Sequence, residues 1–185
     1  MEPLEIEPQP KFTIMEMSVD EIESATEMRL ASWLDTYVNE EIGVTREWIE
    51  LHNIEQVSAE KALSKKKRFT YGKEQGTFNA WVAKDTDGTI MGSTTPFTDD
   101  TGHQHLGSLY VDKKWHGSGV SSELMQKVVD WFDPSKPIEL MVVTYNGRAR
   151  AFYQKWGFEE VPGSNVMFEE KIPEIKMIRK AQNEV

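Results

Sequence analysis

The segment from Leu109 to Ser121 restricts the possible folds of this chain more than any other. A strand-forming triplet is followed by a glycine-rich turn, and the turn leads directly into a helical pattern; the residues are Leu109, Tyr110 and Val111 of the strand, then His116, Gly117, Ser118, Gly119, Val120 and Ser121 of the turn and helix start. Glycines let a ligand approach the backbone closely, and the free N–H groups of a first helical turn attract phosphate. The pattern predicts an α/β fold with an anion site at this junction.

Spacing separates this turn from two well-known phosphate-binding patterns. A P-loop needs a Gly-Lys-Ser/Thr ending, which the stretch from Gly117 to Ser121 lacks. The dinucleotide-binding fingerprint needs glycine at three set positions and a second βαβ unit, and neither is present. For Gly117 and Gly119 taken alone, a tight strand-to-helix connection that binds nothing remains the alternative.

The element order around the turn predicts one domain with a mixed sheet. Phe12 to Met17 is typical of a first strand, and Ser18 with Glu21 forms a capping box that opens a helix. Beyond these, the pattern predicts an antiparallel meander (residues 79–84, 89–98 and 105–111), an amphipathic helix (118–132), an apolar strand (138–144), a short helix (148–156) and a last strand (166–171).

The second helix is expected to begin at the N-cap Thr45 and to run to about Leu63. Its inward residues would be Trp48, Leu51 and Ile54, with Ile49 as the alternative. The basic run Lys65 to Arg68 suits the solvated C-terminal end of this helix.

Both ends of the chain have the composition of tails. Met1 to Pro10 is acidic and rich in proline, and Pro173 to Val185 follows the last predicted strand. The domain is therefore expected to cover residues 11–172, between tails at 1–10 and 173–185.

Composition narrows the function classes. The chain of 185 residues has no cysteine, which excludes disulfides and thiolate chemistry and favours a cytoplasmic location. Its net charge of −10 opposes nucleic-acid binding and favours cationic partners such as amines. No apolar run is long enough to cross a bilayer, so no membrane role is expected.

A second motif runs from Asn146 to Phe158 and has the form Asn-x-x-Ala-x-x-Phe-Tyr-x-x-x-Gly-Phe, with Phe152 and Tyr153 as its aromatic pair. Together with the strand and turn at residues 109–121, this motif resembles the GNAT superfamily of acetyl-CoA-dependent N-acetyltransferases. The resemblance covers roughly residues 105 to 158.

The resemblance implies a mostly antiparallel central sheet flanked by helices and splayed between the strands at 105–111 and 138–144, with acetyl-CoA (coenzyme A) in the gap. Tyr153 would be the general acid beside the sulfur. The cofactor contacts implied are Leu109, Tyr110, Val111, His116, Gly117, Ser118, Gly119, Val120, Ser121, Asn146, Phe152 and Tyr153.

Two residues depart from the family signature in the turn. His116 stands where the family has Gln or Arg, and Ser121 stands where it has Gly or Ala. Both side chains can donate a hydrogen bond, so we expect CoA binding to be retained.

The resemblance also places a catalytic base near His105, where many family members carry a glutamate. Strand alternation puts residues 105, 107, 109 and 111 on one face, and a histidine is a suitable base near neutral pH. An ordinary strand-end imidazole is the alternative. No metal is expected, although His103, His105 and His116 lie near one strand, because no carboxylate at tight spacing supports a metal site.

The leading hypothesis is an enzyme that moves an acetyl group from acetyl-CoA to a primary amine, on a small molecule or a peptide, by direct attack. The helix and loop that contain Trp33, Asp35, Tyr37, Glu40 and Glu41 lie where the family recognises acceptors. We expect a monomer or homodimer. A non-catalytic acyl-CoA-binding module on the same fold is the alternative.

Overall fold

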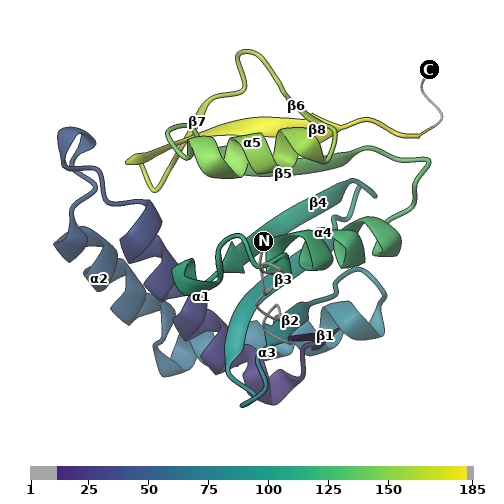
Figure 1. Ribbon diagram of the computed structural model, residues 1–185, viewed down its shortest axis with the longest axis horizontal. Helices are drawn as coiled ribbons and strands as arrows, with labels where there is room; N and C mark the ends of the chain where they lie inside the picture. Colours follow the sequence, from purple (N-terminus) through teal and green to yellow (C-terminus); the bar gives the residue numbers. More distant parts are fainter. Residues whose placement is uncertain (1–11, 183–185) are drawn as a thin grey trace, which may run out of the picture.

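A sheet of eight strands runs through the computed structural model, which describes residues 12–182 (Figure 1). The strand order is β1-β2-β3-β4-β5-β8-β6, and β7 pairs with β8. The strands are β1 (Thr13–Glu16), β2 (Trp81–Lys84), β3 (Ile90–Thr98), β4 (Gln104–Val111), β5 (Ile138–Val143), β6 (Phe158–Glu160), β7 (Val166–Phe168) and β8 (Ile172–Arg179). The helices are α1 (Ile22–Thr36), α2 (Arg46–Gln56), α3 (Ala59–Glu74), α4 (Val120–Trp131) and α5 (Gly147–Lys155).

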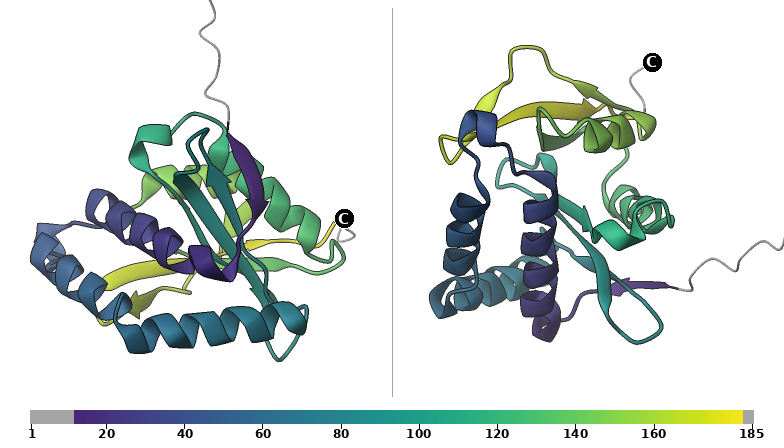
Figure 2. Two further views of the ribbon diagram at one scale, coloured as in Figure 1. Left: turned by 90° about the horizontal axis from the view of Figure 1, so that it is seen from below. Right: turned by 60° about the vertical axis from the view of Figure 1, so that its left-hand side comes forward.

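Alternating side chains on β2 bury both faces of the sheet. Val82 packs in a cluster with residues of α1 and α3, whereas its neighbours Trp81 and Ala83 pack with Val120 and Leu124 of α4. Helices α1 to α3 therefore cover one face and α4 the other, as the right-hand view of Figure 2 shows. The expected mixed, mostly antiparallel sheet flanked by helices is confirmed.

Strands β4 and β5 form a short parallel pair that soon diverges. They pair only at Gln104 with Ile138 and at His105 with Glu139. Beyond these residues β4 continues beside β3 and β5 continues beside β8, so the two strands separate (Figure 1). The splay that the family resemblance implied is present at this point.

A β-bulge at Gly107 changes which way the side chains of β4 face. The pairing with β3 passes from Thr95–Ser108 to Pro96–Leu106, so Gly107 is an extra residue. A Cβ there would lie 2.9 Å from the carbonyl oxygen of Thr95, which explains the glycine.

The expectation that residues 105, 107, 109 and 111 share one face is therefore wrong. Beyond the bulge, Leu109 packs with α4, and Tyr110 turns toward Trp33 of α1. Because the extra residue shifts the alternation by one, His105 shares its face with Tyr110 instead.

The second helix is shorter than expected, and a third follows it. Thr45 caps α2 as predicted, accepting a hydrogen bond from the backbone N–H of Trp48, but α2 ends at Gln56 and Ser58 caps α3. Ile49 and His52 are the buried residues of α2, whereas Leu51 and Ile54 are exposed. The basic run lies within α3 rather than at a helix end.

The C-terminal segment is part of the sheet, so the tail predicted at residues 173–185 is wrong for Pro173 to Arg179. Strand β8 pairs with β5, β6 and β7, and Ile172 and Met177 are almost completely buried. The predicted tail at residues 1–10 lies outside the described residues. Among the helices within residues 12–182, none has the length and apolar composition that crossing a bilayer requires.

Candidate active site

The glycine turn leaves backbone donors without partners at the start of α4. Gly117 and Gly119 adopt left-handed backbone conformations (φ +85° and +91°), and Gly119 is the N-cap of α4. Within the described chain, no group accepts a hydrogen bond from the backbone N–H of Gly119, Val120 or Ser121. A Cβ built on either glycine meets no atom within 4 Å. The helix start thus offers open N–H donors and suits an anion such as a pyrophosphate.

A cavity of about 380 Å³ extends from this turn into the gap between β4 and β5. Most of the residues expected to bind the cofactor line it: Leu109, Tyr110, Val111, His116, Gly117, Ser121, Asn146, Phe152 and Tyr153. We call it the donor cleft.

Three of the expected cofactor residues do not line the donor cleft. The Ser118 hydroxyl donates to the carbonyl oxygen of Trp115 at 2.6 Å, and Val120 is fully buried against the sheet. Gly119 has no side chain. Val120 and Gly119 can therefore contribute only through their backbone N–H groups.

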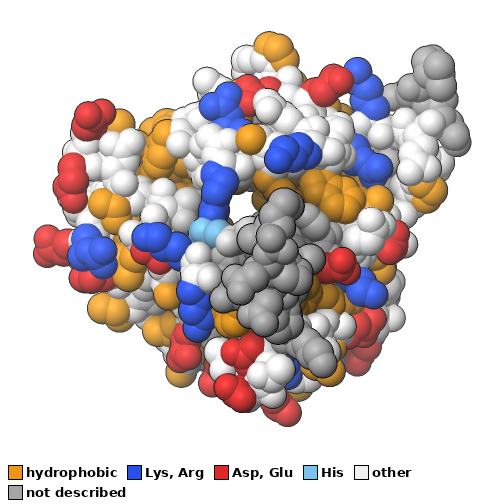
Figure 3. Space-filling model, in the orientation of Figure 1, with side chains coloured by type: hydrophobic (Ala, Val, Ile, Leu, Met, Phe, Trp, Pro, Cys, Tyr) orange, Lys and Arg blue, Asp and Glu red, His pale blue; other side chains and the backbone are white. Residues whose placement is uncertain are grey.

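His116 meets Arg148 at the mouth of the cleft. The His116 Nε2 atom lies 3.0 Å from the carbonyl oxygen of Val111, and its Nδ1 atom faces the Arg148 guanidinium. Burial, and then the Arg148 charge, lower the pKa of His116. In the orientation of Figure 1, basic side chains and a histidine surround a hollow (Figure 3).

Because both ring nitrogens of His116 face protein groups, the imidazole does not offer the free donor that was expected of it. Arg148, in the first turn of α5, brings the cation that a phosphate would need. Sequence reasoning missed Arg148, since it occupies an unspecified position of the second motif.

The second motif folds into α5 and its cap. The Asn146 side chain accepts a hydrogen bond from the backbone N–H of Ala149 at 3.1 Å, so it caps the helix while lining the cleft. Phe152 packs against the core cluster that contains Tyr153.

Tyr153 is 8% exposed and lies among apolar side chains. Burial, and then the nearby Tyr110, raise the pKa of its phenol well above the ordinary value. An ordinary thiol has a pKa of about 8.5, so the proton stays on the phenol when a thiolate forms beside it. Tyr153 is thus suited to donate a hydrogen bond to a developing anion.

Three aromatic residues join α1 to β4 beside the donor cleft. Tyr110 accepts a hydrogen bond from the Trp33 indole at 3.1 Å, and its hydroxyl lies 3.1 Å from that of Tyr37. Burial raises the pKa of Tyr37, as do Tyr110 and, more weakly, Tyr153 and Glu174. Of the residues expected to recognise the acceptor, Trp33 and Tyr37 thus lie at the site. Asp35 instead pairs with Lys113, and Glu40 and Glu41 are exposed.

A second cavity, of about 640 Å³, lies on the α1 side of the sheet. It meets the donor cleft at the β4 bulge, because Tyr37, Gly107, Ser108 and Tyr110 line both. We call it the acceptor cavity.

Three carboxylates in the acceptor cavity were not identified from the sequence: Glu139, Glu169 and Glu174. Glu139 pairs with Lys176 at 2.8 Å. Glu174 is partly buried, and that burial raises the pKa of its carboxyl group. Glu174 was missed because it lies in the segment taken for a tail.

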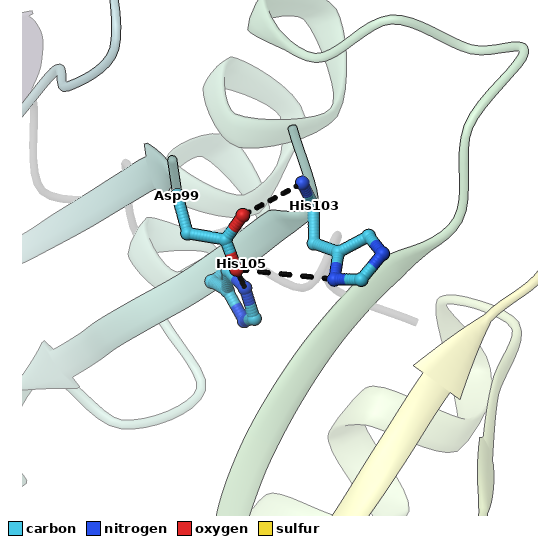
Figure 4. A group of neighbouring side chains, drawn as sticks. All are labelled: Asp99, His103 and His105. Carbon is cyan, nitrogen blue, oxygen red and sulfur yellow. Dashed lines mark hydrogen bonds and ion pairs between the residues drawn. The ribbon is translucent and has the colours of Figure 1, made fainter. Parts of the chain in front are cut away.

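His105 lines the acceptor cavity and is held by a carboxylate (Figure 4). Its Nε2 atom lies 2.9 Å from Asp99 Oδ2, and its ring stacks on Phe97. Asp99 is itself fixed, because Oδ1 accepts backbone hydrogen bonds from Thr101 and His103. The Thr101 hydroxyl, and then His105, hold the pKa of Asp99 well below its usual range.

The same residues have the composition of a metal site. Ligand atoms of Asp99, His103 and His105 all lie within 4.8 Å of one another. The expectation that no carboxylate lies close enough to these histidines to share a metal is therefore wrong. His116, by contrast, lies at the donor cleft and takes no part in this group.

The comparisons with known proteins agree with this geometry. Residues 34–181 match the family model described as an acetyltransferase (GNAT) domain. The chain therefore belongs to the GNAT acetyltransferase family, whose acetyl donor is acetyl-CoA. No curated protein matches it.

Solved structures support the same fold. The PaiA N-acetyltransferase of Thermoplasma acidophilum, in complex with coenzyme A, is 21% identical with a TM-score of 0.71, over 92% of this chain and 99% of that one. A GNAT-family acetyltransferase of Staphylococcus aureus Mu50 is 18% identical with a TM-score of 0.64, over 93% and 100%. Ard1 of Thermoplasma volcanium is 18% identical with a TM-score of 0.62, over 93% and 99%.

Proposed function

We propose that this protein transfers the acetyl group of acetyl-CoA to a primary amine by direct attack. One observation carries the proposal: the donor cleft, with its open N–H groups, meets the acceptor cavity at the β4 bulge, where β4 and β5 separate. A thioester held there is within reach of a nucleophile from the other side of the sheet.

The donor would be held mainly by backbone groups. The N–H groups of Gly119, Val120 and Ser121 would bind the pyrophosphate, and Arg148 would add a positive charge at the cleft mouth. Past the splay, β4 has no strand partner on its β5 side. Its backbone from Leu109 to Val111 is thus available to the pantetheine arm and the thioester.

The chemical step then needs a base and a group that stabilises the leaving thiolate. His105, oriented by Asp99, would take the proton from the ammonium form of the acceptor. The free amine forms a bond to the carbonyl carbon, the carbon–sulfur bond breaks, and the sulfur leaves with its electron pair as a thiolate, while the nitrogen loses its excess proton to solvent. Tyr153 would donate a hydrogen bond from its hydroxyl to this sulfur and keep its proton.

The test is to incubate the protein with acetyl-CoA and a panel of primary amines, and to follow both free CoA and acetylated amine. Amine-dependent release of CoA with matching product is expected. Tight CoA binding with no product from any amine would contradict the enzyme hypothesis and support a non-catalytic acyl-CoA-binding module.

A further inference from the structure

One face of α3 turns four polar residues toward a third cavity. Lys61, Ser64, Lys65 and Arg68 follow helical spacing and line a cavity of about 490 Å³ that is closed by α1, β3 and β4. The basic run was interpreted as a solvated helix end. That interpretation is wrong for Lys65, which is partly buried in this cavity. Arg68 is exposed but lines the cavity, whereas Lys67 is exposed outside it.

Within residues 12–182, three of the four positive charges in this cavity lack acidic partners. Arg29 of α1 joins Lys61, Lys65 and Arg68 in the lining. Among residues 12–182, no carboxylate lies within the 4.0 Å salt-bridge distance of Arg29, Lys65 or Arg68, and only Lys61 has such a partner, Glu55. Such a cluster is unusual in a chain with a net charge of −10, where carboxylates outnumber cations.

Lys65 is the member of the cluster whose positive charge is most disfavoured by its surroundings. It is partly buried, and its ammonium group donates to the carbonyl oxygen of Gln56 at 2.6 Å. Burial, followed by the charges of Arg29, Lys61 and Arg68, lowers its pKa to about 8. An anion in the cavity would relieve this repulsion.

The cationic cavity opens onto the acceptor cavity. Arg29, Gln56, Phe97, Gly107 and Ser108 line both spaces. A molecule whose amine lies near His105 can therefore extend past Phe97 toward Arg68. The lining includes the apolar side chains of Phe69 and Phe97 and the hydroxyl groups of Thr95 and Ser108.

We propose that the acceptor is an amine that carries an anionic group, a carboxylate or a phosphate, at the end remote from the amine, and that Arg29, Lys65 and Arg68 bind this anion. This inference rests on the proposed acetyl transfer and names its substrate class. It reverses the expectation from net charge alone, because the cavity that would hold the remote end of the acceptor is lined by four cations and, among the described residues, by no carboxylate, although the whole protein is negatively charged.

The first experiment compares acceptors that share one alkyl chain and one primary amine. These are ε-aminocaproate, aminohexyl phosphate, n-hexylamine and hexamethylenediamine, with anionic, neutral or cationic remote ends. We expect kcat/KM for at least one of the two anionic acceptors to exceed that for n-hexylamine by about tenfold or more, since hydrogen bonds between charged groups are stronger than those between neutral groups. The anionic acceptor with the higher kcat/KM shows whether the cavity prefers a carboxylate or a phosphate. A preference for n-hexylamine or the diamine overturns the proposal.

Variants then locate the anion. In Lys65→Gln/Arg68→Gln, kcat/KM for the preferred anionic acceptor should fall about tenfold or more, while that for n-hexylamine changes little. Lys67→Gln removes one positive charge from the exposed face of α3 and should change neither. An equal loss for both acceptors would mean a structural role.

A binding measurement separates this proposal from the proposed enzyme activity. Caproate and hexyl phosphate have no amine and cannot be acetylated, so calorimetry with them reports on the cavity alone. Binding to the wild-type protein that the double variant loses supports the anion site even if no amine is turned over. If neither anion binds, the site does not exist, whatever the amine panel shows.

Discussion

The proposed role of Tyr153 depends on the burial of its phenol, which raises the pKa of the hydroxyl group. The raised pKa of its phenol means that the hydroxyl keeps its proton. Tyr153 can therefore donate a hydrogen bond to a departing sulfur. For Tyr153→Phe, which keeps the ring in the core, we expect kcat to fall about 100-fold with acetyl-CoA affinity nearly unchanged. Steady-state kinetics and calorimetry measure the two quantities. Wild-type turnover in the variant would make Tyr153 a packing residue.

His105 is the second residue whose role depends on its surroundings. As the base it must be neutral, so kcat/KM should fall toward acid pH. His105→Gln should lose most of the activity and this limb of the profile. Asp99→Asn should retain the limb at reduced activity, because Asp99 only orients the ring.

His103→Gln is the matched control, since this exposed neighbour also approaches Asp99. Its profile should be that of the wild type. Profiles recorded with and without EDTA test the metal geometry of the same cluster: if EDTA abolishes activity, the histidines act as metal ligands and the base assignment fails.

At the scale of elements, the start of α4 should bind the pyrophosphate. Gly119→Asp and Gly119→Asn place side chains of nearly equal size on a backbone with φ +91°, which both residues tolerate better than most. Only the aspartate places a negative charge beside the open N–H groups. We expect CoA to bind at least about tenfold more weakly to the aspartate variant than to the asparagine variant. Equal affinities in calorimetry would remove the phosphate-binding role of this turn.

The bulge in β4 is the other element on which the site depends. Without the extra residue at Gly107, His105 and Tyr110 would face opposite sides of the sheet. The sequence shows a glycine at this position, but a glycine in a strand does not reveal whether the neighbouring strand leaves a residue unpaired.

At the scale of the whole molecule, β8 joins the strands of the C-terminal part of the sheet. It pairs with β5, β6 and β7, and Met177 is completely buried in the cluster that includes Tyr153. We expect Met177→Ala to lower the free energy of unfolding by about 2–5 kcal/mol. Met167→Ala, on the exposed face of β7, should change it by less than about 0.5 kcal/mol. Equal effects in urea denaturation would contradict the central place of β8.

The sequence by itself determined the local features of this protein. The turn at 116–121, the capping box at Ser18, the cap at Thr45 and the segment Asn146–Phe158 each depend on residues a few positions apart, and such short-range geometry is encoded in residue order. The glycine turn and the second motif also indicated the donor cleft, because residues of both motifs line it.

Only the tertiary structure determined which residues meet around the acceptor cavity and the cationic cavity. Asp99 meets His105 across a turn, Glu174 enters the acceptor cavity from a strand that read as a tail, and Arg29 meets Lys65 and Arg68 from a separate helix. These neighbours come from elements whose relative positions depend on strand order and on one bulge. No short-range pattern records such contacts, because packing and not residue order brings them together.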